Sequence, residues 1–535
     1  MPSKTKPTGT RRRAPTASDS DATLLKADLA VVGAGAAGLY AALCAARERA
    51  SVVLVSATPL AQTASYWAQG GLAAALAADD SPELHRADTE RAGRDLVRPS
   101  AAEILVREAP ECVADLQALG VRFDADRFGR LALGLEGGHS IRRIVHAGGS
   151  ATGRRLVRQL SALVAADPRI TVLEGTRARA LWREGRGGGG GGEAGGHEGS
   201  QDAGTQARFP EDGRCRGLAC EDGHVVWARA VVLATGGAAA LWARTTNPPG
   251  SQGVGLLLGH AVGARLADLE MLQFHPTAVI GVAGREGFLV TEAIRGEGAT
   301  LHDLDTGDRF VDELAPRDEV SRAIQAHLRE TGASAVGLDM RGVDEAHFPN
   351  VVAALREAGL DPARDLVPVA PAAHYAMGGI AVDLNARSSV PGLYVVGESS
   401  CTGLHGANRL ASNSLSECFV FARRAVGEAL SEPAPAEPTV GEQQALRALE
   451  APTAASPETK AALWRDAGIE RAAEGLGRLL DDPYPLVRLI AQCALARKES
   501  RGAHLRLDCP DLDPALDHRH AVIDEEDDLV WETWA

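Results

Sequence analysis

The segment Asp28–Gly38 reads D-L-A-V-V-G-A-G-A-A-G and decides the fold of the chain. Its first half, Leu29–Val32, is a short apolar run with two adjacent valines, which is typical of a strand buried on both faces. Its second half has the spacing G-x-G-x-x-G, in Gly33, Gly35 and Gly38. Such glycines permit a tight turn, close approach of the backbone to a pyrophosphate and close packing of the next helix. The segment therefore predicts a Rossmann-like dinucleotide-binding unit.

The residues that follow supply the context that this motif needs. Apolar residues recur at helical spacing from Leu39 to Ala46, so a helix would point its unpaired N–H groups and positive dipole end at the phosphates. The next predicted strand, Ser51–Val55, ends on Ser56 and Ala57, where an NAD-binding unit would carry an acidic residue for the ribose. This departure disfavours NAD and leaves FAD, if other segments hold the adenosine half.

The bulk composition excludes several classes of protein. A chain of 535 residues is too long for one compact core, so two to four domains are expected. The net charge of -15 disfavours a nucleic-acid partner. The eight cysteines form no C-x-x-C pair, so neither a metal site nor a disulfide framework is predicted, and a reducing, cytoplasmic location is expected. No apolar run is long enough to cross a bilayer, so no membrane partner is expected.

Two strands far apart along the chain end on small residues. Val231–Gly237 reads V-V-L-A-T-G-G and Pro391–Glu398 reads P-G-L-Y-V-V-G-E, and both are typical of buried strands. They predict one sheet assembled from distant pieces, with Ala264–Ala373 inserted between them. Between an inserted domain and a nucleotide-binding sheet lies a favoured place for a substrate.

The remaining segments predict peripheral structure. The first 26 residues are basic and polar, which is typical of a disordered tail rather than a signal peptide. Ser81–Leu119 is expected to be helical. The glycine-dominated stretch Arg183–Arg214 predicts a flexible excursion from a surface hairpin, without a function of its own. Apolar residues at helical spacing between Ala472 and Arg497 predict a small helical module, and acidic Glu525–Ala535 predicts either a docking tail or a frayed end.

Several polar residues that could carry chemistry lie in or beside the inserted region. Each alone has an ordinary explanation: a histidine beside a proline is usually a loop residue, Arg295 between two glutamates can form a surface ion pair, and Arg317 can pair with Asp318. Together, arginines and histidines around one predicted cleft suit a small dicarboxylate, because arginine binds a carboxylate as a bidentate fork. Glu136 could then offer an anion to a substrate ammonium group. The candidates are Gln273, His275, Thr291, Arg295, Arg317, His374 and Arg409.

The order of the motifs resembles the succinate dehydrogenase/fumarate reductase flavoprotein superfamily. The resemblance runs from about Asp28 to Pro510 and omits the glycine-rich insert and both tails. After the glycine motif of Asp28–Gly38, the shared motifs are A-Q-G-G, L-E-G-G-H-S, A-T-G-G, Q-F-H-P-T, T-E-A-I-R-G-E-G, L-A-P-R-D, P-A-A-H-Y, V-G-E, G-A-N-R-L-A-S-N-S-L and R-K-E-S-R-G-A-H-L-R-L-D.

The resemblance implies a fold and a set of site residues. It implies an α/β fold: a Rossmann-like FAD-binding domain at 27–268 and 376–432, with the flexible insert at 184–214, an inserted α+β capping domain at 269–375 and a C-terminal helical domain at 445–520. It makes Arg317 the catalytic arginine, with Glu136 and Arg295 orienting a substrate bound by Gln273, His275, Thr291, His374 and Arg409. The implied FAD contacts are Gly33, Ala34, Gly35, Ala36, Ala37, Gly38, Ala64, Ser65, Gln69, Gly70, Gly71, Glu398, Ser414 and Leu415.

Within the superfamily, the chain is similar to the members that oxidise L-aspartate to iminoaspartate, the first step of de novo NAD biosynthesis. The resemblance implies hydride transfer to flavin N5, reoxidation of the flavin by oxygen or fumarate, and quinolinate synthase as a candidate partner. Two alternatives stay open: a soluble fumarate reductase or succinate oxidase, and a non-catalytic flavoprotein or scaffold. Glu136 separates L-aspartate oxidation from the fumarate reductase or succinate oxidase alternative, because succinate has no ammonium group to meet it.

Three positions bear on how FAD is held. Ala64 stands where members with covalent FAD carry a histidine, which implies a non-covalent cofactor. Val254 replaces an acidic residue of the superfamily, and Ala57 replaces a lysine near the adenosine half. Both departures bear on the tightness of FAD binding more than on the identity of the cofactor.

Overall fold

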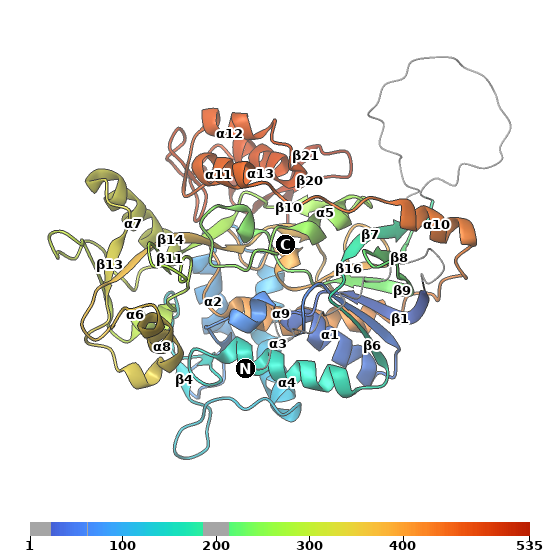
Figure 1. Cartoon of the computed structure of the whole chain (residues 1–535), viewed down its shortest axis with the longest axis horizontal. Coiled ribbons are helices and arrows are strands. Elements are labelled where there is room, and N and C mark those ends of the chain that lie inside the picture. The colour runs from blue at the N-terminus through green and yellow to red at the C-terminus, as the bar shows by residue number, and fades with distance from the viewer. Residues whose placement is uncertain (1–22, 61–62, 186–212) are drawn as a thin grey trace, which may run out of the picture.

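A computed structural model describes residues 23–60, 63–185 and 213–535 of the chain (Figure 1). Residues 1–22 of the predicted tail and 186–212 of the predicted flexible insert lie outside these ranges. The first strand begins at Leu24, whereas the disordered tail was expected to extend to residue 26. The expected end of the tail is therefore wrong. Leu24, Leu25 and Lys26 pair with Val225–Trp227, and this pairing satisfies the backbone groups that a free tail would leave to water.

A mostly parallel sheet holds the glycine motif at the end of its central strand. Four parallel strands have the order β6-β2-β1-β9, and β16 adds to the end of β9 in parallel as well. This pairing confirms the prediction of one sheet built from distant pieces. The antiparallel hairpin β7–β8 extends the sheet beyond β9, which confirms the hairpin predicted around the insert. The strands are β1 (Leu24–Val32), β2 (Val52–Ser56), β6 (Ile170–Glu174), β7 (Ala178–Arg183), β8 (Cys215–Cys220), β9 (Val225–Leu233) and β16 (Leu393–Val395).

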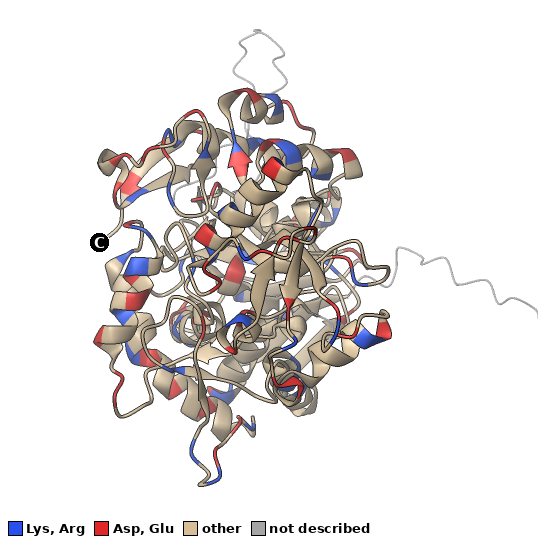
Figure 2. Ribbon diagram, turned by 90° about the vertical axis from the view of Figure 1, so that its left-hand side faces the viewer, with Lys and Arg blue, Asp and Glu red and all other residues tan. Residues whose placement is uncertain are grey.

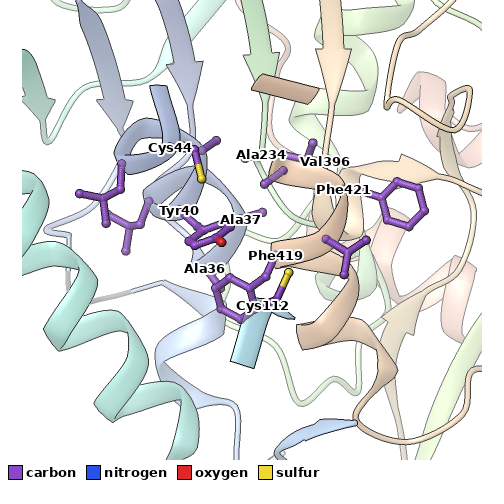
Figure 3. Packing of buried hydrophobic residues seen from close by; sticks show 14 of the residues in the cluster. Ala36, Ala37, Tyr40, Cys44, Cys112, Ala234, Val396, Phe419 and Phe421 are labelled. Carbon is purple, nitrogen blue, oxygen red and sulfur yellow. The ribbon is translucent and has the colours of Figure 1, made fainter. Parts of the chain in front are cut away.

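Alternate residues of the strands feed two different cores, as expected for a sheet buried on both faces. Leu29 and Val31 belong to the core under helices α1, α3, α4 and α9, whereas Ala30 and Val32 belong to the core on the opposite face. In the first core the rings of Tyr40 and Phe419 meet edge to face, with centroids 5.2 Å apart (Figure 3). The helices are α1 (Ala36–Arg47), α3 (Pro99–Ala118), α4 (Thr152–Ala166) and α9 (Asn413–Ala429).

The segment expected to be helical from Ser81 to Leu119 contains two helices, α2 (Pro82–Ala92) and α3. The helix breaks after Gly93, because Arg94 and Asp95 take left-handed conformations, with φ of 56° and 59°. Pro99 then opens α3, where its missing N–H costs nothing.

A separate layer, which we call the capping unit, projects from the sheet (Figure 1, left). Its antiparallel strands have the order β11-β14-β13-β12, and they enclose a core of their own with three helices. The long strands β11 and β14 pair with each other, and in sequence they follow β10 (Leu266–Ala267) and precede β15 (Gly379–Ala381). The elements are β11 (Leu272–Val279), α6 (Glu292–Gly296), β12 (Thr300–His302), α7 (Arg317–Thr331), β13 (Val336–Asp339), α8 (Pro349–Glu357) and β14 (Val367–Ala376).

The C-terminal region contains the predicted helices, α11 (Pro457–Asp466), α12 (Ala473–Leu479) and α13 (Pro485–Ala496), together with short strands that were not predicted. Glu525–Ala535 was expected to be a docking tail or a frayed end, and this is wrong: β20 (Arg519–Ile523) and β21 (Leu529–Thr533) form a hairpin. The hairpin joins β10 (Leu266–Ala267), and Trp534 stacks on buried His520 with centroids 4.2 Å apart.

The hairpin thereby completes a five-stranded sheet of order β17-β15-β10-β20-β21, whose members β10 and β15 flank the capping unit in sequence. Short elements fill the remaining chain. Basic and acidic residues are interspersed along the helices and loops in the view of Figure 2. No helix in the described ranges has the length and apolar character needed to traverse a bilayer. The short elements are β3 (Leu72–Ala73), β4 (Leu133–Gly134), β5 (Ile144–Val145), α5 (Val254–His260), β15 (Gly379–Ala381), β17 (Ser400–Cys401), α10 (Val440–Ala448), β18 (Glu470–Arg471) and β19 (Leu505–Arg506).

Candidate active site

The glycine turn between β1 and α1 is as tight as the sequence predicts. Gly33 has a φ of +107°, and a Cβ there would lie 2.2 Å from the carbonyl oxygen of Ala234. A Cβ at Gly38 would lie 1.8 Å from the carbonyl oxygen of Gly33, so only glycine lets α1 approach the strand this closely. Gly35 at the N-cap of α1 makes no side-chain cap hydrogen bond, and the positive end of the helix dipole at this turn suits an anion.

The other predicted FAD segments gather around this turn. The Ser65 hydroxyl accepts a hydrogen bond of 3.1 Å from the Ala36 N–H, which ties the short helix η1 (Ala64–Trp67) to the start of α1. The buried Gln69 Oε1 has no hydrogen-bond partner among the described residues. A buried acceptor without a donor is costly, so this oxygen points to a ligand. The residues present therefore fit a dinucleotide such as FAD.

Glu398 lies at the carboxyl end of the sheet, in the short helix η4 (Gly397–Ser399) after β16. Its carboxylate is so close to Gly237 that a Cβ there would lie 2.4 Å from Oε1. The same oxygen accepts a hydrogen bond of 3.0 Å from the Ala376 N–H. Burial raises the pKa of Glu398 to about 7. A ligand that donates hydrogen bonds to this carboxylate would therefore bind more tightly when Glu398 is ionised.

Two arginines converge on one glutamine at the base of the capping unit. Arg317, at the start of α7, donates to Gln273 Oε1 at 3.0 Å, and Arg409 donates to the same oxygen at 3.2 Å. Arg409 also donates to the Ser414 hydroxyl at 2.5 Å. Burial, and then the charge of Arg317, lower the pKa of Arg409 to about 10. Two buried guanidinium groups side by side make this pocket strongly attractive to an anion.

Glu292 is the counter-ion of the pocket. Its Oε2 accepts a hydrogen bond of 2.5 Å from Arg317 Nε, and its Oε1 lies 3.5 Å from Arg295 Nη2. Burial acts to raise the pKa of Glu292, but the charges of Arg317 and Arg295 outweigh it and lower the pKa. The surface ion pair considered for Arg295 is therefore wrong, since both side chains are buried. Asp318 pairs with Arg94 and Arg322 rather than with Arg317.

Two histidines line the pocket from β11 and β14. The rings of His275 and His374 have centroids 5.1 Å apart. Burial and the charge of Arg317 lower the pKa of both well below the usual value, so both rings are neutral near pH 7. The Thr277 N–H donates to His275 Nδ1 at 3.2 Å, which leaves the proton on Nε2. A neutral ring with an Nε2–H can donate a hydrogen bond to a carboxylate.

Glu136 approaches from the loop between β4 and β5, and only 3% of its surface is exposed. Its Oε2 accepts a hydrogen bond of 2.6 Å from the Ser412 hydroxyl. Its Oε1 has no hydrogen-bond partner among the described residues. A Cβ added to Gly70 would lie 3.5 Å from that oxygen, so the free oxygen faces the predicted FAD segment.

The structure brings most of the predicted substrate residues together, from segments far apart in sequence. Arg317 and Arg409 are both hydrogen-bonded to Gln273. Thr291 lies at the start of α6, next to Glu292. The sequence analysis missed the role of Glu292 as the counter-ion of the two arginines, although its spacing of three residues from Arg295 was a signal. It also missed Ser412, for which the sequence offers no signal, because its partner Glu136 lies 276 positions away.

Comparison with known proteins agrees with this geometry. A family model described as FAD binding domain matches residues 28–415, and one described as fumarate reductase flavoprotein C-term matches residues 479–533. The L-aspartate oxidase of Caulobacter vibrioides is 45% identical over 511 residues, which cover 90% of this chain and 94% of that one. The L-aspartate oxidase of Agrobacterium fabrum is 42% identical, over 89% of this chain and 90% of that one.

Solved structures give the same result at the level of the fold. An E. coli quinol fumarate reductase superposes with a TM-score of 0.80 at 28% identity, over 95% of this chain and 96% of that one. The resemblance predicted from the motifs is thereby confirmed. With a dinucleotide turn, two buried arginines that share one glutamine, and relatives that match almost its whole length, the chain belongs to the L-aspartate oxidase family of FAD-binding flavoproteins.

Proposed function

We propose that the protein oxidises L-aspartate to iminoaspartate in the pocket between the FAD-binding sheet and the capping unit. The names of the relatives support this substrate. The observation that carries the proposal is the pairing of opposite charges in one site. Arg317 and Arg409 share Gln273 and attract carboxylates, whereas Glu136 keeps one buried oxygen free for an ammonium group. L-Aspartate carries two carboxylates and one ammonium, so its charges complement these groups.

Each residue has a role in this proposal. Arg409 and Arg295 hold the two carboxylates, and Nε of Arg295 is a buried donor without a partner among the described residues. His275 and His374 donate additional hydrogen bonds, with Gln273 and Thr291 completing the wall. Glu136 accepts from the ammonium group. Arg317 acts as the acid–base group that accepts the substrate proton, and its Nε is hydrogen-bonded to Glu292.

The proposed cofactor is FAD, held without a covalent bond. When bound, it would supply the redox step by accepting a hydride at N5. Gly33–Gly38 and Ala64–Gly71 would hold its phosphates and ring system, with Glu398, Ser414 and Leu415 closing the site. The pocket residues orient the substrate and exclude water. By the resemblance, oxygen or fumarate would reoxidise the flavin, and quinolinate synthase is a candidate partner. The proposal also includes the domain limits: an FAD-binding domain at 27–268 and 376–432, a capping domain at 269–375 and a C-terminal helical domain at 445–520.

A denaturation experiment tests the mode of attachment. Ala64 has a methyl side chain that cannot bond to the flavin. We therefore expect acid precipitation of the purified protein to release all of the flavin into the supernatant, measured by its absorbance. Yellow colour retained in the washed pellet would contradict a non-covalent cofactor.

A substrate comparison tests the reaction. The alternative, a soluble fumarate reductase or succinate oxidase, needs the arginines but not Glu136. We expect the purified protein to produce hydrogen peroxide in air with L-aspartate and not with succinate. Oxidation of succinate at a comparable rate would favour the alternative, and no oxidation of either would favour a non-catalytic flavoprotein. Glu136→Gln keeps the shape and removes the charge, so it should raise the KM for L-aspartate more than the inhibition constant of succinate.

A further inference from the structure

The hydroxyl of Ser412 lies between a backbone amide and the carboxylate of Glu136. The Gly71 N–H donates to Ser412 Oγ at 3.0 Å, and Ser412 Oγ lies 2.6 Å from Glu136 Oε2. Because the amide can only donate and an ionised carboxylate can only accept, the hydroxyl proton must point to the carboxylate. The chain of bonds therefore ties Glu136 to the backbone of the predicted FAD segment.

The backbone of Ser412 takes a conformation that L-residues rarely adopt. Its φ is +62° and its ψ is -5°, which lies in the left-handed region. The turn holds because the Ser412 carbonyl accepts a hydrogen bond of 3.3 Å from the Ala73 N–H and because α9 begins at the next residue. Glycine would adopt this turn without strain, but it would supply no hydroxyl. An observed strain of this kind in a pocket points to a function for the side chain.

The hydrogen bond leaves the two oxygens of Glu136 in different states. Oε2 is held by Ser412, while buried Oε1 has no hydrogen-bond partner among the described residues. A buried carboxylate oxygen without a donor is costly, and an ammonium group carries three donors. The carboxylate is thus fixed in one rotation, with the free oxygen ready for a substrate donor.

The same loop also carries a carboxylate-binding side chain. Arg409 lies three residues before Ser412, and its guanidinium donates to Ser414, two residues after Ser412. The loop 409–414 therefore sets the separation between the arginine and the free oxygen of Glu136. We propose that Ser412 is a positioning residue that fixes Glu136 for the amino group of the substrate and so favours L-aspartate over dicarboxylates without one. This inference rests on the proposed function.

Two variants test the role of the hydroxyl. Ser412→Gly removes the hydroxyl and suits the left-handed turn, whereas Ser412→Ala removes the hydroxyl and keeps the Cβ. For each we would measure kcat/KM for L-aspartate, the inhibition constant of succinate and the bound flavin by absorbance. Loss of one charge-assisted hydrogen bond should lower the preference for L-aspartate over succinate about tenfold in both variants.

A matched control removes another buried hydroxyl from α9. Ser416 donates to the carbonyl oxygen of Ala73 at 2.7 Å and forms no hydrogen bond with the carboxylate of Glu136, so Ser416→Ala should keep the wild-type preference. An equal loss for both ligands, an unchanged preference, or a loss in Ser412→Ala alone would overturn the positioning role. Failure of the wild-type protein to oxidise L-aspartate would overturn the proposed function and this inference with it, whereas an active wild type with unaffected Ser412 variants would overturn the inference alone.

Discussion

At the scale of single residues, Gln273 decides how the cations of the pocket are arranged. Its amide oxygen accepts from Arg317 and Arg409, and its amide nitrogen donates to the Asn408 side chain at 3.0 Å and to the Arg409 carbonyl at 2.8 Å. The glutamine thus holds two like charges in place without neutralising either. A bound dicarboxylate would relieve their mutual repulsion, so the pocket is prepared for an anion before it binds one.

Arg317→Lys separates proton transfer from simple binding. Lysine keeps the charge but loses the planar fork that reaches both Glu292 and Gln273. We expect kcat for L-aspartate to fall at least about 100-fold near pH 7, the size of an acid–base contribution, and to recover partly as the pH approaches the lysine pKa of about 10.4. Steady-state kinetics from pH 7 to 10 would measure this.

The control for this variant lies on the same helix. Arg322 pairs with Asp318 on α7 and forms no hydrogen bond or ion pair with Gln273 or Glu292, so Arg322→Lys should keep the wild-type rate. A raised KM with an intact kcat in Arg317→Lys would instead assign Arg317 to holding a carboxylate.

At the scale of elements, the junction of β1 with α1 and the end of β16 form the two sides of the dinucleotide site. The first is fixed by sterics, because glycines allow the turn and the helix to meet. The second is fixed by electrostatics, because the Glu398 carboxylate is desolvated and only the Ala376 N–H and the charge of Arg409 favour its ionised form. The two sides therefore respond to different perturbations.

Gly38→Ala tests the steric side. The new methyl would collide with the carbonyl of Gly33, so we expect a loss of stability of about 2–4 kcal/mol and loss of bound FAD. Thermal unfolding and flavin absorbance would measure both. Gly427 lies in α9 with no heavy atom within 4 Å of an added Cβ, so Gly427→Ala should be neutral or stabilising by up to about 1 kcal/mol. Equal behaviour of the two variants would contradict this view of the turn.

The pH dependence of FAD binding tests the electrostatic side. The pKa of Glu398 is raised to about 7 by burial in the free protein, and hydroxyl donors of a bound nucleotide would lower it. Below pH 7 binding must then release a proton, so the Kd of FAD should rise as the pH falls from 7 to 6, by up to about tenfold. Flavin fluorescence titrations at pH 8, 7 and 6 would measure this. Glu398→Gln should show a flat profile over the same range.

At the scale of the whole molecule, the sequence was sufficient for the elements with strong local patterns. β1, α1 and β9 were predicted from apolar runs and glycine spacing, and the paired ends of β9 and β16 followed from the small residues that close both strands. The hairpin β20–β21 was missed, because its position depends on pairing with β10, which is distant in sequence. The local sequence alone gives no clear strand pattern there. Glu292 and Ser412 were missed for a similar reason: their roles depend on side chains brought near by the fold.

Deletion of the glycine-rich insert tests how far this region matters to the whole. The described ends of the insert are adjacent, since the Glu184 N–H donates to the Arg214 carbonyl at 2.9 Å. A two-residue Asn-Gly turn could therefore close the hairpin β7–β8. We expect a chain with residues 185–213 replaced by Asn-Gly to keep its flavin and about the wild-type rate of L-aspartate oxidation. Complete loss of flavin would assign the insert a function.

The order of strands in the central sheet has a consequence for synthesis on the ribosome. β9 emerges early, but its parallel neighbour β16 emerges only after every residue of the capping unit has been translated. Until then the nascent chain exposes an unfinished, apolar strand edge, which is prone to intermolecular association. We therefore expect chaperone demand to be greatest while the capping unit is being synthesised, and to fall once the strand that completes the edge has left the exit tunnel.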